Sequence, residues 1–408
     1  MYRHSPELSQ WIDQVSSNLP GLSKAQANVL GMYSLGMVIV QSCGMSGIAY
    51  ALGMLFGKSE NTMRQRLREL TYAAQDKRGQ KRRELDVSTC FAPLLSWVLA
   101  WWAADEKRLA LALDASNLGQ RFTVLSISVV YRGCAVPVAW QVLCATKKGA
   151  WKPHWLALLE HLSDAVPADW TVIVLSDRGL YAKWLFTAIQ KLKWHPFMRI
   201  TLAGNFRPSG QTRFRPLASI APRVGSTWSG QIECFSTKHA QLTCTLLARW
   251  DAGYAQPWLI LTDLPAQAAN IAWYGMRTWI EQGFKDCKRG GLRWEHTKMT
   301  DPERATRLWL IIAVATLWIV SVGGQADAAL TASSFDELPL TYSARHRLLR
   351  RRPRRLSCFR RGVITLVVTM IKGQPLPWGC FIPEPWPDHS VETTSVQAIH
   401  GALAHVLV

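Results

Sequence analysis

Three carboxylates, Asp114, Asp177 and Glu281, have the chemical type and the setting expected of catalytic groups. Both aspartates follow apolar, strand-like segments, and Glu281 lies among cations in a segment of helical periodicity. Taken singly, each has an ordinary explanation, because Asp is common where strands end and a helical Glu beside Lys usually forms a surface pair. If the three converge, their charges repel one another unless cations are bound. Oxygen ligands favour hard divalent ions, so we expect two Mg²⁺ ions, replaceable by Mn²⁺, and in-line phosphoryl transfer.

The segment around Glu281, residues 273–288, is predicted to be one helix with two different faces. Its chemical face has side chains at offsets of 3, 4, 4 and 3 residues: Tyr274, Arg277, Glu281, Lys285 and Lys288. At about 100° per residue these fall in an arc roughly 80° wide along roughly 21 Å of axis. The second face is apolar and suited to burial: Trp273, Met276, Ile280, Phe284 and Cys287. We therefore expect an open edge where a carboxylate holds a metal while cations and a phenol contact phosphates.

The composition favours a nucleic-acid partner. The 408 residues are 49% hydrophobic, which suffices for two or three domains with cores of their own. The 47 Lys and Arg residues outnumber the 28 Asp and Glu residues, for a net charge of +19. A surplus of this size indicates a polyanionic partner, because Lys and Arg displace counterions from phosphates. A two-carboxylate hydrolase acting on sugars would explain neither this charge nor the cationic helix.

The cysteines and the apolar runs bear on where the chain works. Nine cysteines are scattered without any Cys-x-x-Cys pair, which argues against a disulfide framework and a zinc site and for a reducing cytoplasm. The N-terminus lacks the apolar run of a signal peptide. The most apolar stretch, residues 308–322, is shorter than the roughly 20 residues that a membrane span needs. We expect a buried core helix there and no membrane role.

Residues 1–104 are predicted to form an all-helical N-terminal domain. Within it, residues 47–56, a turn at 57–59 and residues 60–72 have helix–turn–helix proportions, with Ser59 as N-cap. The second of these helices carries three arginines: Arg64, Arg66 and Arg68. An ordinary helical hairpin with a basic face explains this pattern as well as a DNA-reading helix does.

From residue 105 the pattern changes to that of an α/β fold. Strand-like runs are expected at 108–114, 122–131, 136–143, 171–175 and 196–201, with helices around the fourth. The runs that end at Asp114 and Asp177 are almost continuously apolar, which is typical of central strands in a mixed sheet. Ligands gather beyond the ends of such strands. Residues 205–265 are instead predicted to form a β-rich insertion.

The C-terminal region, residues 326–408, is predicted to contact DNA, to mediate dimerisation, or both. Residues 343–362 hold nine arginines, among them the candidate DNA contacts Arg350, Arg351 and Arg354. A run this dense favours nonspecific phosphate contact over a merely solvated surface.

Taken together, three motifs resemble a known family. They are Asp114-Ala-Ser, Ser-Asp177-Arg-Gly, and Tyr274 followed by Arg277, Glu281 and Lys288. In this order they resemble bacterial insertion-sequence transposases of the DDE type, in the branch with a Tyr-Arg-Glu-Lys signature. The resemblance covers about residues 105–325. It implies an RNase H-like catalytic core with a β-rich insertion, and cut-and-paste transposition by a dimer that joins two transposon ends.

The resemblance also implies roles for single residues. Asp114, Asp177 and Glu281 match the metal-binding triad. Tyr274, Arg277 and Lys288 match signature positions that grip DNA near the cleavage point, and Lys285 matches a further basic position. Related enzymes hold a flipped base on a tryptophan in or near the insertion, for which Trp228, Trp250 and Trp258 are candidates. The implied partners are double-stranded DNA, as terminal inverted repeats and as target, and a second copy of the chain in a bacterial cytoplasm, at the nucleoid.

Two alternatives remain open on the sequence alone. The first keeps the fold and is a metal-dependent nuclease or resolvase that cuts DNA without joining it. The second is a DNA-binding regulator that uses residues 47–72 and the arginine run, with a degenerate nuclease-like domain. The presence of all three carboxylates argues against the second.

Overall fold

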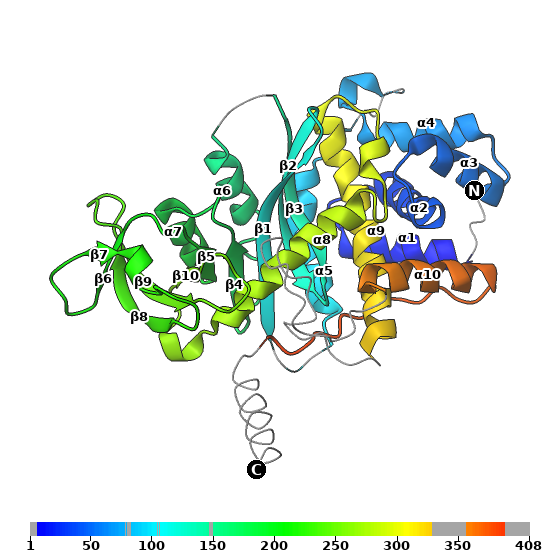
Figure 1. Ribbon diagram of the computed structural model, residues 1–408. Helices are drawn as coiled ribbons and strands as arrows, with labels where there is room; N and C mark the ends of the chain where they lie inside the picture. Colours follow the sequence, from blue (N-terminus) through cyan, green and yellow to red (C-terminus); the bar gives the residue numbers. More distant parts are fainter. Residues whose placement is uncertain are drawn as a thin grey trace, which may run out of the picture.

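The N-terminal helices pack beside a ten-stranded sheet in a computed structural model of the protein (Figure 1). The structure describes residues 6–77, 79, 83–103, 105, 107–146, 150–328 and 356–387. The first elements are α1 (Pro6–Asn18), α2 (Lys24–Val40), α3 (Met45–Phe56), α4 (Glu60–Thr71), the 3₁₀-helices η1 (Ala74–Asp76) and η2 (Val87–Cys90), and α5 (Phe91–Ala100). Their buried apolar side chains belong to one core cluster with those of the sheet. The chain therefore begins with helices, as expected.

The pair α3 and α4 has the predicted helix–turn–helix form. α3 ends at Gly57, whose φ of 60° lies in the left-handed region that glycine tolerates. Ser59 then caps α4, because its Oγ accepts a hydrogen bond from the amide of Thr62 at 3.2 Å. The prediction of two helices joined by residues 57–59 is confirmed, while a DNA-reading role for α4 stays a prediction.

Five strands form the core of the sheet, in the order β3-β2-β1-β4-β5. Their bounds are β1 (Arg108–Leu118), β2 (Phe122–Tyr131), β3 (Cys134–Cys144), β4 (Thr171–Ser176) and β5 (His195–Arg199). β1, β4 and β5 run parallel, and β2 and β3 add an antiparallel hairpin beside β1. This arrangement is that of an RNase H-like core, so the expected α/β fold class is confirmed.

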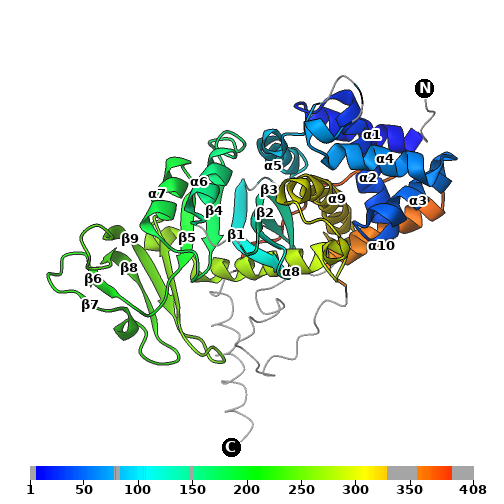
Figure 2. The same ribbon diagram turned by 90° about the horizontal axis from the view of Figure 1, so that it is seen from above.

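Helices cover both faces of this core. Figure 2 shows α6 (Lys152–Glu160) and α7 (Lys183–Lys191) on one face, and α8 (Thr278–Cys287) crossing the other. Every residue of β2 is consequently buried, which explains why its sequence is apolar without alternation.

The predicted β-rich insertion is present, but it continues the core sheet. Its elements are β6 (Asn205–Pro208), β7 (Arg215–Pro216), η3 (Leu217–Ser219), β8 (Thr227–Cys234), β9 (Leu242–Arg249), β10 (Trp258–Thr262) and η4 (Ala266–Ala268). β10 pairs antiparallel with β5, with Ile260 opposite Arg199, and the order beyond β5 is β10-β9-β8-β6-β7. The insertion thereby covers an edge of β5 that would otherwise expose unpaired backbone groups.

A long helix, α9 (Pro302–Ala328), packs against β3 and lies between the sheet and the N-terminal helices (Figure 2). Among the described residues it is the one unbroken helix that is long and apolar enough to span a membrane, yet its apolar window is 100% buried inside the fold. It is therefore the core helix predicted over residues 308–322, extended at both ends. α10 (Cys358–Ile371) crosses it so closely that a Cβ on Gly362 would lie 1.8 Å from the carbonyl oxygen of Ile319.

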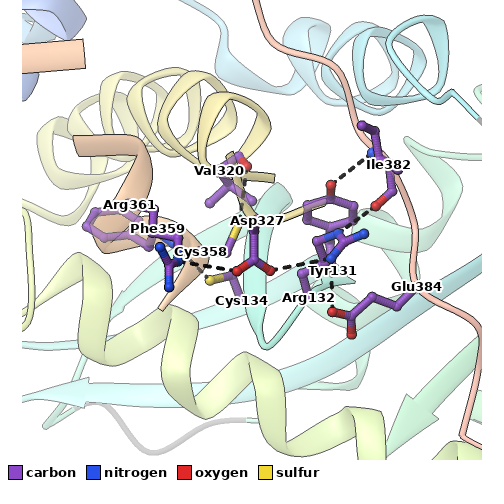
Figure 3. A network of polar contacts seen from close by, with 10 residues as sticks. All are labelled: Tyr131, Arg132, Cys134, Val320, Asp327, Cys358, Phe359, Arg361, Ile382 and Glu384. Atoms are coloured by element: carbon purple, nitrogen blue, oxygen red, sulfur yellow. Dashed lines mark hydrogen bonds and ion pairs between the residues drawn. The ribbon is translucent and has the colours of Figure 1, made fainter. Parts of the chain in front are cut away.

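A buried polar network ties the C-terminal segment to the core (Figure 3). Arg132, in the turn between β2 and β3, forms ion pairs with Asp327 of α9 at 3.4 Å and with Glu384 at 3.1 Å. Arg361 of α10 lies 3.3 Å from the other carboxylate oxygen of Asp327. Two guanidinium groups thus balance two buried carboxylates, either of which would be costly to bury alone. The network holds α10 and the segment around Glu384 against the β2–β3 hairpin.

Candidate active site

Asp114 and Asp177 occupy equivalent positions on neighbouring parallel strands. β1 and β4 are paired as far as Ala112 and Leu175, and each aspartate lies two residues further on. Asp177 directly follows β4, as predicted. Asp114 does not end β1, which continues to Leu118 because its pairing with β2 continues. What ends before Asp114 is the pairing with β4, so both aspartates lie just beyond the parallel part of the sheet, where ligands of such sheets bind.

Each aspartate is oriented by a backbone amide. Oδ1 of Asp114 accepts a hydrogen bond from the amide of Ala115 at 2.8 Å, and Oδ1 of Asp177 accepts one from the amide of Gly179 at 2.9 Å. A Cβ on Gly179 would lie 3.3 Å from Oδ1 of Asp177, which explains why a small residue suits this tight turn. The Oδ2 atom of each carboxylate therefore points in a fixed direction.

The segment predicted as one helix over residues 273–288 is divided. It begins as the 3₁₀-helix η5 (Ile271–Arg277), capped by the side chain of Asn270, and becomes α8 only at Thr278. Residues three apart eclipse one another in a 3₁₀-helix, so Tyr274 and Arg277 point the same way. Both are buried, with 5% and 7% of their surface exposed. The expectation of a single open edge is therefore wrong for these two residues.

Arg277 lies at the centre of the three carboxylates. Its Nη2 is 3.0 Å from Oδ2 of Asp114 and 3.5 Å from Oδ2 of Asp177, and its Nη1 is 3.1 Å from Oε1 of Glu281. The three acids come from β1, from the turn after β4 and from α8. The convergence that the sequence predicted is present, with a guanidinium group shared among the acids.

The protonation equilibria of this cluster reflect burial and mutual charge. Burial raises the pKa of the Asp114 carboxyl and outweighs the opposing effect of Arg277. For Arg277, burial alone would lower the pKa, but the nearby carboxylates, Asp114 foremost, raise it above its ordinary value. Arg277 is therefore a permanent cation in this site.

The apolar face of the segment fixes Glu281 in place, as predicted. Met276, Ile280, Phe284 and Cys287 are buried, and Trp273 is packed against the core. Gly283 brings α8 close to the sheet, because a Cβ at this position would lie 2.7 Å from Cβ of Ala135. The side chain of Glu281 stays 49% exposed on the outer face.

A groove of about 900 Å³ leads away from Asp114 and Glu281. Its cationic lining is Lys285, Lys288 and Arg289. Lys285 is exposed, as predicted. Lys288 is the C-cap of α8, and its ammonium donates to Oγ of Ser116 at 2.6 Å and to the carbonyl oxygen of Asn117 at 2.7 Å. It therefore joins α8 to β1 in addition to lining the groove.

The structure adds a residue that the sequence reasoning missed, Arg199 at the end of β5. Its guanidinium carbon lies 5.8 Å from the ring centroid of Trp258 and 6.0 Å from that of Tyr274. Burial lowers the pKa of Arg199, and the neighbouring cations Arg178 and Arg277 lower it further, while Tyr274 opposes them. Burial likewise raises the pKa of the Tyr274 phenol to about 12. The sequence could have indicated Arg199, because it ends the apolar strand β5, which pairs with the strand β4 that precedes Asp177.

The three tryptophan candidates differ in accessibility. Trp258 is buried and packs edge-on against Tyr274, with ring centroids 5.2 Å apart. Trp228 and Trp250 are half-buried, and the indole nitrogen of Trp250 donates to the carbonyl oxygen of Tyr254 at 2.9 Å. Of the three, Trp228 and Trp250 retain surface on which a base could stack.

The donor chemistry of the triad fits hard divalent ions. Three carboxylates supply only oxygen ligands, which Mg²⁺ and Mn²⁺ prefer. Within the described ranges, however, no three His, Cys, Asp or Glu side chains are grouped as a metal site. Asp114, Asp177 and Glu281 instead surround Arg277, so their inner oxygens are the groups that would hold an ion.

The remaining predicted contacts lie away from the triad. α4 carries Arg64, Arg66 and Arg68 on the far side of α9 from the sheet (Figure 2). Arg64 forms an ion pair with Glu60, and Arg68 is exposed. The candidates of the arginine run, Arg350, Arg351 and Arg354, fall outside the described residues.

Comparisons with known proteins found one family and a similar solved structure. The model of a family described as the transposase DDE domain matches residues 105–318, a range that contains all three carboxylates. Among solved structures, the chain is similar to the piggyBac transposase in a synaptic complex with hairpin DNA, with a TM-score of 0.36 and 10% sequence identity. That similarity covers 82% of this chain and 76% of the other. No curated protein matches the chain.

Proposed function

The chain belongs to the transposase DDE domain family, and we propose that it cleaves DNA at the ends of a transposable element and joins those ends to target DNA. The observation that carries the proposal is the convergence of Asp114, Asp177 and Glu281, from three separate elements, at one end of the parallel strands. Such a cluster is costly without a cationic ligand. It lies beside a groove with exposed cations, as a phosphodiester substrate requires.

The three carboxylates are proposed to hold two divalent ions, Mg²⁺ or, as a substitute, Mn²⁺. Such ions activate a water or a 3′-hydroxyl and stabilise the leaving oxygen in an in-line displacement. The chain's own contribution is orientation. The amides of Ala115 and Gly179 fix the two aspartates, and the apolar face of α8 fixes Glu281.

The DNA strand is proposed to follow the groove and the surface beside it. Lys285 and Arg289 are exposed there and suited to backbone phosphates. Arg199 is half-buried and packs against the buried Tyr274, which lies close enough to Asp114 and Asp177 for their charges to act on its phenol. Arg199 is proposed to position the phosphate next to the one that reacts, with Tyr274 supporting it from behind. Lys288 positions α8 and adds charge to the groove.

The wider biology is proposed from the family and the sequence. The Tyr-Arg-Glu-Lys spacing indicates an insertion-sequence transposase that moves its element by cutting and pasting, in a bacterial cytoplasm at the nucleoid. A homodimer would bring two terminal inverted repeats together. A hairpin at the cleaved end, with a flipped base on Trp228 or Trp250, would suit their remaining exposed surface.

A cleavage and joining assay tests this function. The full chain is incubated with DNA carrying both ends of its element and with a supercoiled target, in Mg²⁺, in Mn²⁺ and in a chelator. We expect cut ends and joined products with either metal and none with the chelator. Cut ends without joined products would favour a nuclease or resolvase, and binding without cutting would favour a regulator.

A further inference from the structure

Arg277 forms ion pairs with the same carboxylate oxygens of Asp114, Asp177 and Glu281 that a metal ion would need as ligands. In both aspartates Oδ1 is held by a backbone amide, which leaves Oδ2 as the inward-facing oxygen. Both Oδ2 atoms contact the same Nη2 of Arg277, at 3.0 and 3.5 Å. The other terminal nitrogen of Arg277, Nη1, is 3.1 Å from Oε1 of Glu281. One planar cation therefore contacts all three acids at once.

The charges in this cluster do not balance. Three carboxylates face one guanidinium, so the site still attracts positive charge while its inward oxygens are engaged. The side chain of Arg277 is only 8% exposed, and its Nε is buried without a hydrogen-bond partner among the described residues. A buried polar atom without a partner costs free energy, so this arrangement of Arg277 is stabilised mainly by its three ion pairs.

We propose that Arg277 is an internal competitor of the catalytic metal ions, and that a phosphate of the bound DNA end releases it. Asp114, Asp177 and Glu281 cannot offer their inward oxygens fully to divalent ions while these oxygens bind the guanidinium. A backbone phosphate beside η5 gives Arg277 another anion, and a guanidinium matches phosphate in a two-point contact. Release of the three acids then raises their affinity for the ions.

This proposal rests on the proposed function and adds its regulation. Metal binding and binding of the DNA end become coupled, so each raises the affinity for the other by the same factor. The chain is then poor at binding catalytic ions when it is free, and becomes competent where its own DNA end is seated. Nonproductive hydrolysis of other DNA is reduced in consequence.

The test measures Mn²⁺ binding, without reference to catalysis. The full chain is titrated with Mn²⁺, and the free ion is followed by electron paramagnetic resonance. Without DNA, we expect Arg277→Gln to bind Mn²⁺ more tightly than the wild type by a factor of about ten, a coupling of ordinary size. Arg277→Lys, which keeps a charge but has a compact head that cannot span three acids, should also bind more tightly.

Arg199→Gln is the matched control. It removes a nearby guanidinium that contacts none of the three carboxylates through an ion pair in the described part of the chain. If loss of local positive charge were sufficient, Arg199→Gln would match Arg277→Gln. We expect its effect on Mn²⁺ affinity to be much smaller, and equal effects would overturn the proposal.

A DNA arm tests the release step. A duplex carrying the end of the element is added, and the Mn²⁺ bound by that duplex alone is subtracted. The wild type should gain more Mn²⁺ affinity from the duplex than Arg277→Gln, which has no competitor left to release. An equal gain in both, or Mn²⁺ binding by Arg277→Gln and Arg277→Lys no tighter than by the wild type, would refute the competition.

Failure of the proposed function gives a different result. If Asp114→Asn leaves Mn²⁺ binding unchanged in the wild-type and Arg277→Gln backgrounds, the triad is not a metal site and the function itself is wrong. If Asp114→Asn removes Mn²⁺ binding and the wild type cuts its ends, while the Arg277 variants bind Mn²⁺ like the wild type, only the competition is wrong.

Discussion

The ammonium group of Lys288 lies 2.6 Å from the hydroxyl of Ser116 and so joins the end of α8 to β1. A second bond, to the carbonyl oxygen of Asn117, strengthens this connection. Burial lowers the pKa of Lys288, which is the effect expected when a cation leaves water. Lys285, three residues earlier, is exposed, and its ammonium group makes no hydrogen bond or ion pair within the described part of the chain. Of these two cations in one groove, Lys288 therefore joins two elements of the fold, whereas Lys285 is available for a ligand.

Lys288→Met is expected to destabilise the chain, whereas Lys285→Met is not. The first change removes two hydrogen bonds from a charged donor and should lower the stability by about 1–2 kcal/mol. The second should stay within about 0.5 kcal/mol of the wild type, yet lower the salt dependence of DNA binding by about one phosphate contact. Thermal unfolding and binding titrations across salt concentrations measure both. An unchanged Tm in Lys288→Met would return that residue to the purely DNA-contacting role predicted from sequence.

Glu281→Gln is expected to remove DNA cleavage while leaving end-binding nearly normal. The substitution keeps the size of the side chain but removes a charge that the proposed metal ions need, so cleavage should fall by at least about 100-fold. The fold should persist, because this side chain is 49% exposed and the apolar face of α8 is untouched. Cleavage of end-bearing DNA at full rate by this variant would show that the catalytic assignment is wrong.

Arg199→Gln is expected to weaken DNA binding without lowering stability. Burial and the neighbouring cations Arg178 and Arg277 outweigh the favourable interaction with Tyr274, so the charge of Arg199 does not stabilise the free chain. Loss of one phosphate contact should reduce the salt slope of binding by about one. Arg249→Gln is the matched control, because the Nε of Arg249 is already bound to Asp251 at 2.5 Å. Equal salt slopes for the two variants would remove Arg199 from the DNA-binding surface.

The parts of the fold that the sequence could predict are those with strong local patterns. Apolar runs predicted β2 at its observed bounds, 122–131, and helical periodicity predicted α4 over residues 60–72, one residue beyond its observed end at Thr71. The three carboxylates could be assigned to elements from their neighbours. The two aspartates follow nearly continuous apolar runs, which predict central strands, and Glu281 lies in a segment of helical periodicity. Local pattern therefore sufficed for these elements and for the placement of Asp114, Asp177 and Glu281 on or directly after them.

What could not be predicted depends on contacts between distant segments or on a small change in helical period. The pairing of β10 with β5 joins residues 260 and 199, and no local pattern specifies it. The 3₁₀ geometry of η5 differs little in sequence from an α-helix, yet it turns Tyr274 and Arg277 inward. Arg277 lies among the three acids because the 3₁₀ geometry directs its side chain inward. A regular α-helical period of about 100° per residue does not predict this direction.

Asp286, on the buried side of α8, predicts a pH dependence of stability. Burial raises the pKa of its carboxyl to about 7, although Gln282 donates to Oδ1 at 2.9 Å. A folded-state pKa above the unfolded value stabilises the fold below about pH 4, and this contribution is lost as the pH rises to 7. Above pH 7 the fold must contain a buried carboxylate, and a pKa near 7 in place of about 3.9 corresponds to roughly 4 kcal/mol.

Asp286→Asn should therefore raise the Tm at pH 8 and have a smaller effect at pH 5, where only the first part of the stabilising contribution of the protonated carboxyl has been lost. Asn keeps the oxygen that accepts from Gln282, so the packing of α8 is preserved. Asp164→Asn, a change at an exposed carboxyl, serves as the control and should shift the Tm little at either pH. Thermal unfolding of the three proteins at both pH values measures the difference. An equal gain for Asp286→Asn at pH 5 and pH 8 would mean that packing, and not ionisation of Asp286, limits the stability of this helix.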